Sequence, residues 1–303
     1  MGNPNFAIPA LEAIHKSNHD LIAVVSNPPK PMGRGRSLQS TSVGKFAKLN
    51  DIKLIEPLSL LSKDLKYQLK ELKPDIFVIV AYKILPNELI DIPIHGAINL
   101  HASLLPKYRG AGPIQWALMN GDKNTGVSIF QIKQKVDTGD ILVQKRIKIF
   151  DEDNMLSLGM RLCETGAMMI IKTMNSIEEG KIQPIKQDPD MATNAPKITK
   201  KMTVIDWSWP AHKIHNWVRG LSPNPGMSST LNSKKIRIFK TATASGEDGT
   251  PGSIVELTKK NLSVRTGEGA LSLLEIQIEG KKRMLVDEFL KGAKLEIGDK
   301  FGI

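Results

Sequence analysis

Hydrophobic and polar positions follow two alternating patterns along the first 180 residues. Unbroken apolar runs of strand length predict buried strands at residues 21–26 and 75–82. Apolar residues at helical spacing predict helices at residues 42–50 and 60–73, on either side of a strand at 52–57. The pattern continues with a strand at 96–106, a helix at 112–121, a strand pair at 125–132 and 139–149, and a long helix at 154–180. Such alternation predicts an α/β fold with an open, mostly parallel sheet.

The first residues open directly on a helix, with apolar Phe6, Ile8, Leu11 and Ile14. A Gly-Asn-Pro turn that leads into a helix of an α/β unit is expected to follow a buried strand, yet Met1 immediately precedes this turn. We therefore expect the first strand of the unit to be missing from the sequence. A sheet that lacks an inner strand leaves backbone donors and acceptors unpaired on both of its neighbours.

The pattern changes in the polar stretch at residues 183–201, which contains Pro184, Pro189 and Pro196. We interpret this change as a domain boundary, with a first domain at 1–190, a linker at 191–204 and a second domain at 205–303. A helix at 209–221 opens the second domain. Short alternating segments separated by Gly turns then predict a small antiparallel β-barrel, at 234–243, 252–258, 261–267, 270–280 and 300–303.

Composition places the chain among globular proteins, with 41% hydrophobic and 24% charged residues. No apolar run is long enough to span a bilayer, and the first residues do not form a secretion signal, so we expect a cytoplasmic protein without membrane contact. The net charge of +11 is concentrated late in the chain. Residues 191–303 hold 18 Lys and Arg against 11 Asp and Glu, a net of +7, which favours a polyanionic partner for the second domain.

Cys163 is the single cysteine of the chain, which excludes a disulfide framework and a cysteine metal site. Its neighbours at helical spacing are apolar, and no His lies nearby in the sequence to activate it. We interpret it as a small buried hydrophobic residue rather than a nucleophile.

The densest group of candidate catalytic residues lies between Asn99 and Asp140. Asn99 and His101 are two residues apart on a predicted strand, so both side chains point to the same face, and Asp137 follows in the segment VDTGD. Acyl transfer to an amine passes through a tetrahedral intermediate with a negative oxygen. An amide and an imidazole can donate hydrogen bonds to that oxygen. The attacking nitrogen must also lose a proton, and an Asp near the His can raise the basicity of the imidazole and move protons through water. The alternative is structural, with Asn99 and His101 capping a loop and Asp137 opening a turn.

Five segments, together spanning nearly the whole chain, resemble one protein family. The core is NLHASLLPKYRGAGPIQWALMNGDKNTGVSIFQIKQKVDTGDIL, and the others are GNPNFAIPALEAI, NPPKPMGRGRSL, VIVAYKILP and IDWSWPAHKIHNWVRGLSPNPG. They are similar to the folate-dependent formyltransferases and, within these, to the methionyl-tRNA formyltransferases. The resemblance implies a Rossmann-like catalytic domain followed by a barrel of the oligonucleotide-binding type.

The resemblance also implies roles for individual residues. Asn99, His101 and Asp137 would be catalytic. The formyl donor, 10-formyltetrahydrofolate, would contact the turn of Ser103, Leu104, Leu105 and Pro106, and its pteridine would contact Val80, Ala81, Tyr82, Ile84, Leu85 and Asp140. Arg34 would bind the acceptor stem of initiator methionyl-tRNA. Independently of the resemblance, the basic residues Lys30 and Arg36 of the same loop and the cluster of Lys234, Lys235 and Arg237 are further candidates for contact with the tRNA. A monomer without a metal ion is expected.

Two other functions stay open at this point. The same chemistry could serve a small amine, although the basic second domain argues against it, or the chain could be a noncatalytic RNA-binding relative. The Gly-rich segments GRGR and GDKNTG lack the spacing of phosphate-binding loops, which excludes a nucleotide-dependent kinase or dehydrogenase. We expect His212 and His215 to serve packing rather than metal binding.

Overall fold

The computed structural model describes residues 1–32, 36–246 and 248–302. These residues form two compact units. The amino-terminal unit comprises Met1–Pro113, Thr125–Lys148 and Gly159–Ala195. The carboxyl-terminal unit comprises Ile114–Asn124, Ile149–Leu158 and Pro196–Ile303. The change from one unit to the other at residues 195 and 196 falls inside the segment predicted as the linker.

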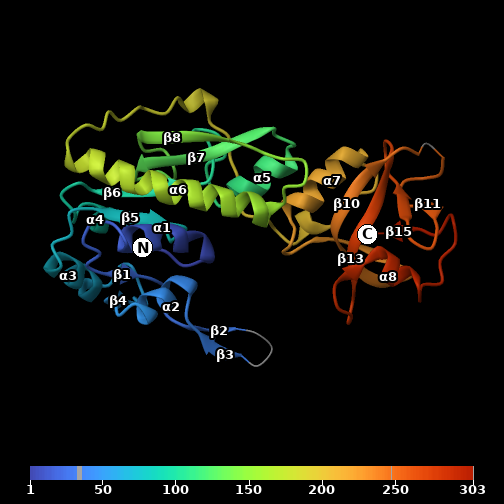
Figure 1. The fold of residues 1–303 in the computed structure, drawn as a ribbon, viewed down its shortest axis with the longest axis horizontal. Helices are drawn as coiled ribbons and strands as arrows, with labels where there is room; N and C mark the ends of the chain where they lie inside the picture. The colour runs from blue at the N-terminus through green and yellow to red at the C-terminus, as the bar shows by residue number, and fades with distance from the viewer. Residues whose placement is uncertain (33–35, 247, 303) are drawn as a thin grey trace. The chain divides into compact units, whose positions relative to one another are not determined.

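The elements before residue 192 alternate between strand and helix (Figure 1). They are η1 (Asn5–Ala7), α1 (Ile8–His15), β1 (Val24–Val25), β2 (Lys30–Met32), β3 (Ser37–Gln39), α2 (Ser42–Leu49), β4 (Leu54–Ile55), α3 (Lys63–Glu71), β5 (Phe77–Val80), α4 (Asn87–Ile90), β6 (Ala97–His101), α5 (Pro113–Met119), β7 (Asn124–Gln131), β8 (Ile141–Lys148), α6 (Met155–Glu178) and η2 (Pro189–Met191).

Parallel pairing dominates the first half of this unit. β1 pairs in parallel with β4, and β5 pairs in parallel with β6. Met1 and Gly2 lie between the two pairs, since the Gly2 N–H donates to the Val25 carbonyl at 3.1 Å and the Val80 N–H donates to the Met1 carbonyl at 2.9 Å. β7 then adds to β6 in antiparallel orientation, and β8 follows β7. The predicted mostly parallel α/β fold is confirmed.

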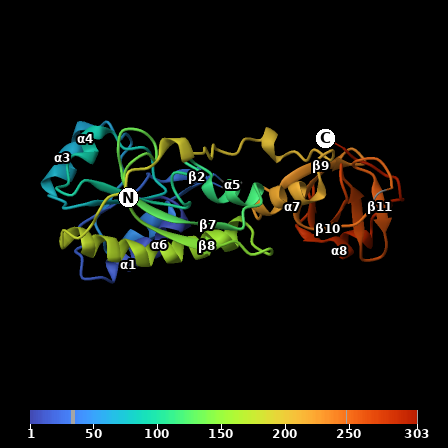
Figure 2. The same cartoon turned by 90° about the horizontal axis from the view of Figure 1, so that it is seen from above.

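Helix α6 runs alongside β7 and β8 in both ribbon views (Figures 1 and 2). Its buried face carries Leu158, Leu162 and Ile170, each fully buried. Gly166 allows α6 to approach the sheet closely, because a Cβ at this position would lie 2.5 Å from the Leu100 side chain of β6. The helix thereby fixes the strand that carries Asn99 and His101.

The carboxyl-terminal unit is an antiparallel sheet of strand order β11-β12-β13-β10-β9-β15, with β14 paired to β13. Its two edges approach each other, since Ser253 and Lys300 form an antiparallel bridge. The interior is apolar, with Met227, Ile236 and Leu271 fully buried. The predicted small antiparallel barrel is thus confirmed as a curled sheet. Its elements are η3 (Lys201–Thr203), α7 (Ala211–Gly220), β9 (Met227–Leu231), β10 (Lys234–Ala244), β11 (Ile254–Leu257), β12 (Leu262–Arg265), β13 (Ala270–Ile278), β14 (Met284–Leu285), α8 (Val286–Leu290) and β15 (Phe301–Gly302).

Several local predictions differ from the structure. The helix predicted around Phe6 to Ile14 begins at Ile8, after a 3-10 turn at Asn5–Ala7. Between the strand predicted at 21–26 and the helix predicted at 42–50, where no element was predicted, the structure has the hairpin of β2 and β3. Strand β9 was not predicted, because its sequence MSSTL carries three polar residues that become buried or half-buried only through pairing with β10.

Cys163 is buried, as interpreted from its apolar neighbours. Burial raises the pKa of its thiol, with a further contribution from the charge of Glu164, so the nucleophilic thiolate is disfavoured. His215 packs in the carboxyl-terminal unit with its Nδ1 3.0 Å from the Thr241 hydroxyl. No helix in the described ranges is both long enough and apolar enough to span a bilayer.

Candidate active site

Strand β6 brings Asn99 and His101 to the interior of the amino-terminal unit. Asn99 is in register with Ile79 of β5 on one side and with Phe130 of β7 on the other, and His101 is opposite Ser128. His101 is 6% exposed, whereas Asn99 is half-buried. The His101 ring meets the edge of Phe130 at 6.4 Å between centroids. An inner strand and an aromatic contact therefore hold the imidazole in one orientation.

The hydrogen bonds of His101 assign roles to its two ring nitrogens. Nε2 lies 2.8 Å from the carbonyl oxygen of Tyr108. A carbonyl oxygen can only accept, so Nε2 carries a proton and donates it. Nδ1 faces the Asp137 carboxylate, with 3.7 Å between Nδ1 and Oδ2. This separation is too long for a direct hydrogen bond, so a water or a reacting group can bind both atoms.

Asp137 reaches His101 from the loop between β7 and β8. Its backbone is in the left-handed region, with φ of 53°, and its carboxylate is 13% exposed. Oδ2 accepts a hydrogen bond of 2.8 Å from the N–H of Gly110, which belongs to the loop after β6. The two loops thus meet at the carboxylate. His101 and Asp137 therefore lie side by side, whereas the place of Asn99, two residues before His101 on β6, in the same site stays a prediction.

Gln187 supports this loop from a segment that sequence reasoning treated as the approach to the linker. Its Nε2 donates to the backbone carbonyls of Asp137 at 2.9 Å and Gly139 at 2.7 Å. Its Oε1 accepts from Nε and Nη2 of Arg109 at 3.1 and 2.7 Å. A lone Gln in a polar, Pro-containing stretch gives no periodic signal, so the sequence did not reveal this role.

Replacing Gln187 with Ala is expected to lower kcat of the proposed formyl transfer about tenfold, with a smaller effect on KM. The loop would lose its hydrogen bonds to this side chain, so Asp137 would be held less firmly beside His101. Gln183→Ala is the matched control, because Gln183 is exposed. Equal kcat values for the two variants would show that Gln187 does not help to position Asp137.

The turn of Ser103, Leu104, Leu105 and Pro106 is held by two polar residues from β7 and β8. The Ser128 hydroxyl donates to the Ser103 carbonyl at 2.6 Å and accepts from the Leu105 N–H at 3.0 Å. Gln144 donates to the Leu105 carbonyl at 2.8 Å. The Ser103 side chain is fully buried and donates to the carbonyl of Lys107. A folate contact with this turn stays a prediction, and Leu104 and Pro106 are its half-exposed members.

The segment from Val80 to Leu85 follows the carboxyl end of β5, which pairs in parallel with β6. Val80 and Leu85 are buried, whereas Ala81 is exposed with a φ of 50° and Ile84 is 72% exposed. The Tyr82 hydroxyl is buried without a hydrogen-bond partner among the described residues, and burial raises the pKa of Tyr82 to about 12. Asp140 pairs with Lys133 at 2.7 Å. The contact of these residues with a pteridine also stays a prediction.

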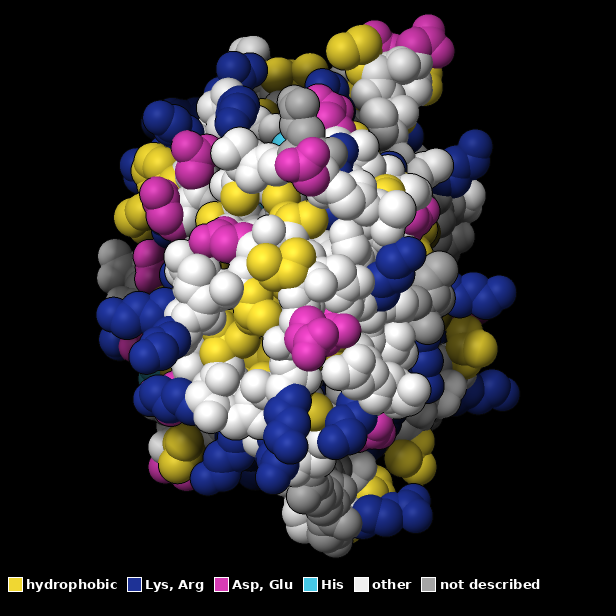
Figure 3. All heavy atoms as spheres, turned by 90° about the vertical axis from the view of Figure 1, so that its right-hand side faces the viewer, with side chains coloured by type: hydrophobic (Ala, Val, Ile, Leu, Met, Phe, Trp, Pro, Cys, Tyr) yellow, Lys and Arg dark blue, Asp and Glu magenta, His cyan; other side chains and the backbone are white. Residues whose placement is uncertain are grey.

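The predicted tRNA-binding residues belong to different segments. Lys30 and Arg36 are exposed on the β2–β3 hairpin, and Arg34 lies outside the described residues. Lys234, Lys235 and Arg237 are exposed on β10, where Ile236 and Ile238 face the core. The face shown in Figure 3 carries Lys and Arg mainly toward its periphery, around a strip of hydrophobic side chains.

Comparison with known proteins gives matches over both parts of the chain. The formyl transferase family model matches residues 1–174, and the model of the formyl transferase C-terminal domain matches residues 197–294. The methionyl-tRNA formyltransferase of Thermodesulfovibrio yellowstonii is 44% identical over 98% of this chain and 96% of its own length. The chain belongs to the methionyl-tRNA formyltransferase family.

Other relatives agree with this family assignment. The methionyl-tRNA formyltransferase of Geobacter metallireducens is 40% identical over the whole chain and 97% of its own length. The structure of the sugar 3N-formyl transferase WlaRD, solved in the presence of dTDP and 5-N-formyl-THF, superposes with a TM-score of 0.67 at 21% identity. It covers 93% of this chain and 97% of WlaRD, and it shows a shared fold.

Proposed function

We propose that this chain transfers the formyl group of 10-formyltetrahydrofolate to the α-amino group of methionyl initiator tRNA, in translation initiation. The observation that carries this proposal is the approach of the Asp137 carboxylate to His101, which lies on the same strand as Asn99, within a chain of this family. All three groups come from one chain, so a monomer suffices. Translation initiation would place the reaction in the cytoplasm.

Formyl transfer requires that the site stabilise one negative charge and move one proton. The acceptor amine attacks the formyl carbon, and a C–N bond forms while the carbonyl oxygen becomes negative. The Asn99 amide and a protonated His101 Nδ1 would donate hydrogen bonds to this oxygen, and each such donor contributes about 2.7–4 kcal/mol in comparable sites. The carbon's bond to N10 of the folate then breaks, and the formyl group stays on the amine.

Asp137 would accept the proton that the attacking nitrogen must lose. Its carboxylate lies beside His101 Nδ1, so the proton can return through the imidazole or a shared water to the departing N10 nitrogen. The hydrogen bond from Nε2 to Tyr108 fixes the ring during this exchange. No covalent intermediate on the protein is needed, since the amine itself is the nucleophile.

Formyl transfer by the purified chain tests this proposal directly. With 10-formyltetrahydrofolate as donor, charged initiator tRNA should be formylated at a kcat/KM far above that for an amino-sugar nucleotide. Preference for the small amine would indicate the alternative substrate class. Binding of tRNA without any transfer would instead indicate a noncatalytic RNA-binding protein.

The exposed basic residues of β10 provide a test of the tRNA interface. Replacing Lys235 and Arg237 together with Ala should raise KM for the tRNA several-fold and leave kcat unchanged, because these side chains would bind phosphates and not the reacting groups. The slope of log affinity against log salt concentration should become shallower by about 0.9 for each phosphate that the variant no longer neutralises. The control is the replacement of both Lys259 and Lys260 with Ala, which removes the same charge from the turn between β11 and β12. Equal KM values for both double variants would contradict this interface.

A further inference from the structure

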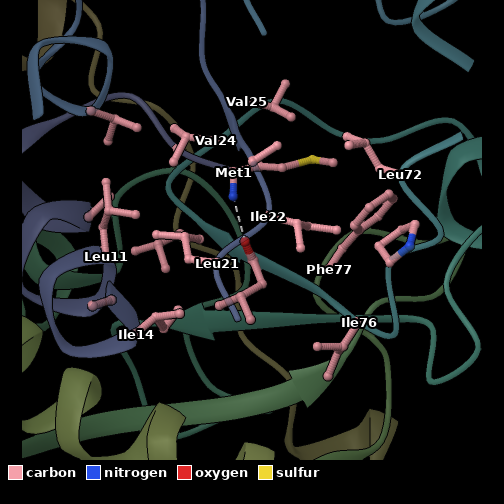
Figure 4. Close-up of a pocket in the computed structure, with 18 of the residues that line it drawn as sticks. Met1, Leu11, Ile14, Leu21, Ile22, Val24, Val25, Leu72, Ile76 and Phe77 are labelled. Carbon is pink, nitrogen blue, oxygen red and sulfur yellow. Dashed lines mark hydrogen bonds between the residues drawn. The ribbon is translucent and has the colours of Figure 1, made fainter. Parts of the chain in front are cut away.

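Apolar packing holds the sheet around His101, but it does not decide which ring atom faces Asp137. Phe77 of β5, the parallel neighbour of β6, lines an apolar pocket together with Leu11 and Ile14 of α1 (Figure 4). Apolar contacts are non-directional, so they do not distinguish a ring nitrogen from a ring carbon. The direction of the two His101 nitrogens therefore depends on the hydrogen bonds around the ring.

A short segment, residues 193–195, runs along the loop that follows β6, and we call this segment the strap. Loop and strap both belong to the amino-terminal unit, and Arg109 and Asn194 form a parallel bridge between them. The Arg109 N–H donates to the Thr193 carbonyl at 2.8 Å, and the Ala195 N–H donates to the Arg109 carbonyl at 2.7 Å. The strap and the loop are thus joined by backbone hydrogen bonds, as two neighbouring strands are.

One peptide group of the loop connects the strap to His101. The Tyr108 carbonyl accepts the 2.8 Å hydrogen bond from His101 Nε2. The N–H of the same peptide group belongs to Arg109, which donates to the Thr193 carbonyl. A trans peptide group is planar and directs its C=O and its N–H to opposite sides. The Thr193 carbonyl therefore fixes the direction in which the acceptor of His101 points.

The next peptide group connects the strap to Asp137 in the same way, with donor and acceptor exchanged. Its N–H belongs to Gly110 and donates to Asp137 Oδ2 at 2.8 Å, and its carbonyl belongs to Arg109 and accepts from Ala195. A Cβ on Gly110 would lie 2.7 Å from the Ala195 oxygen, so this close approach requires glycine. One edge of the loop thus pairs with the strap, and the other edge offers an acceptor to His101 and a donor to Asp137.

The backbone of Tyr108 has a conformation that its surroundings must support. Its φ is 61°, in the left-handed region that bulky residues rarely adopt. The Thr193 hydroxyl oxygen accepts from the Tyr108 N–H at 2.9 Å, and the Thr193 carbonyl accepts from the following N–H, that of Arg109. Thr193 thus holds the N–H groups on both sides of the Tyr108 Cα. Relaxation of this φ would turn the Tyr108 carbonyl away from His101.

We propose that Thr193 is a positioning residue for His101, acting through the backbone of Tyr108, and that the strap sets the geometry of the pair formed by His101 and Asp137. Of the strap contacts described above, the Thr193 hydroxyl is the one that a side-chain substitution removes, since the others are made by the backbone. The kinetic consequence of this inference rests on the proposed function, whereas its structural consequence does not.

Thr193→Val tests this role, with Thr193→Ser as the conservative variant. Val has nearly the shape of Thr but lacks the hydroxyl acceptor, which Ser keeps. Thr193 is exposed, so neither change opens a cavity in the core. In Thr193→Val, kcat for formyl transfer should fall about five- to tenfold while KM for both substrates stays within about twofold, and Thr193→Ser should keep at least about half of the parent kcat. Thr199→Val, also exposed, is the matched control.

Nitrogen-15 NMR of the His101 ring provides a measurement that does not depend on turnover. In the neutral ring of the parent chain, Nε2 should carry the proton, because it donates to the Tyr108 carbonyl. Thr193→Val should move the two ring nitrogen shifts toward each other as the other tautomer becomes populated, and Thr193→Ser should leave them near the parent values. Amide hydrogen exchange at Tyr108 should become roughly tenfold faster in Thr193→Val.

Two results would overturn the proposal. Unchanged His101 nitrogen shifts and unchanged Tyr108 exchange in Thr193→Val would show that Thr193 does not position this loop. An equal loss of kcat in Thr193→Val and Thr193→Ser, with the denaturant midpoint lowered in both, would show a role in folding alone. The NMR changes in a parent chain that does not transfer formyl groups would instead contradict the proposed function and leave the positioning of His101 by Thr193 in place.

Discussion

Replacing His101 with Ala is expected to lower kcat for formyl transfer by a factor of about 10² to 10⁴. The imidazole is the group through which Asp137 and the reacting atoms would exchange a proton, and its Nδ1 is the nitrogen directed at the carboxylate. The change in KM should be small, because the ring would act mainly on charge that develops during the reaction. Steady-state and single-turnover kinetics with charged initiator tRNA measure this effect.

His95→Ala is the matched control for this variant, because His95 is exposed and lies six positions before His101. Asp137→Asn is a companion variant that keeps the side-chain shape and its hydrogen bond from Gly110 while removing the proton acceptor. It should also lower kcat by about 10² or more. Activity of both His101→Ala and Asp137→Asn within threefold of the parent would rule out the proposed mechanism.

Replacing Gly139 with Ala is expected to damage both the loop that carries Asp137 and the stability of the chain. A Cβ at this position would lie 1.5 Å from the backbone oxygen of Gln131, and no rotation of a side chain can relieve a clash with backbone. Overpacking of this kind costs about 1–3 kcal/mol and sometimes more. The loop would have to move, so kcat should also fall at least about tenfold.

Denaturant unfolding and formyl-transfer kinetics together measure this second variant. Gly292→Ala is the control, since a Cβ there would meet nothing within 4 Å. The same midpoint of unfolding and the same kcat for both glycine variants would show that the loop tolerates the methyl group. In that case the close approach of Gly139 to Gln131 would not determine where Asp137 lies.

Periodicity in the sequence predicted the elements that bury a continuous face. The long helix predicted at 154–180 is α6 at Met155–Glu178, and the predicted strand pair around Asp137 is β7 and β8. Both rest on patterns repeated over eight residues or more, in which many apolar positions agree. The proximity of His101 and Asp137 was inferred from chemistry and family resemblance, since nothing in their spacing of 36 residues encodes a contact.

The features that the sequence did not reveal depend on contacts with residues outside their own segment. Gln187 takes its role from carbonyls that are 48 and 50 residues away in the chain. Strand β9 becomes a strand through its register with β10 and β15. His101 is fixed by the backbone carbonyl of Tyr108, and because every residue has such a carbonyl, the sequence does not mark this one. None of these has a local pattern that distinguishes it from loop sequence.

The interleaved division of the chain limits how it can be cut. The polypeptide passes between the two units five times, so residues 114–124 and 149–158 lie in the carboxyl-terminal unit although they precede residue 196. A protease that cleaved between Ala195 and Pro196 would leave both stretches on the amino-terminal fragment. In the other fragment, Trp217 would lose its ring contact with Trp116, and Arg219 would lose its hydrogen bond to the Phe150 carbonyl. A fragment made of residues 196–303 alone should therefore expose part of its apolar core and aggregate more readily than the complete chain.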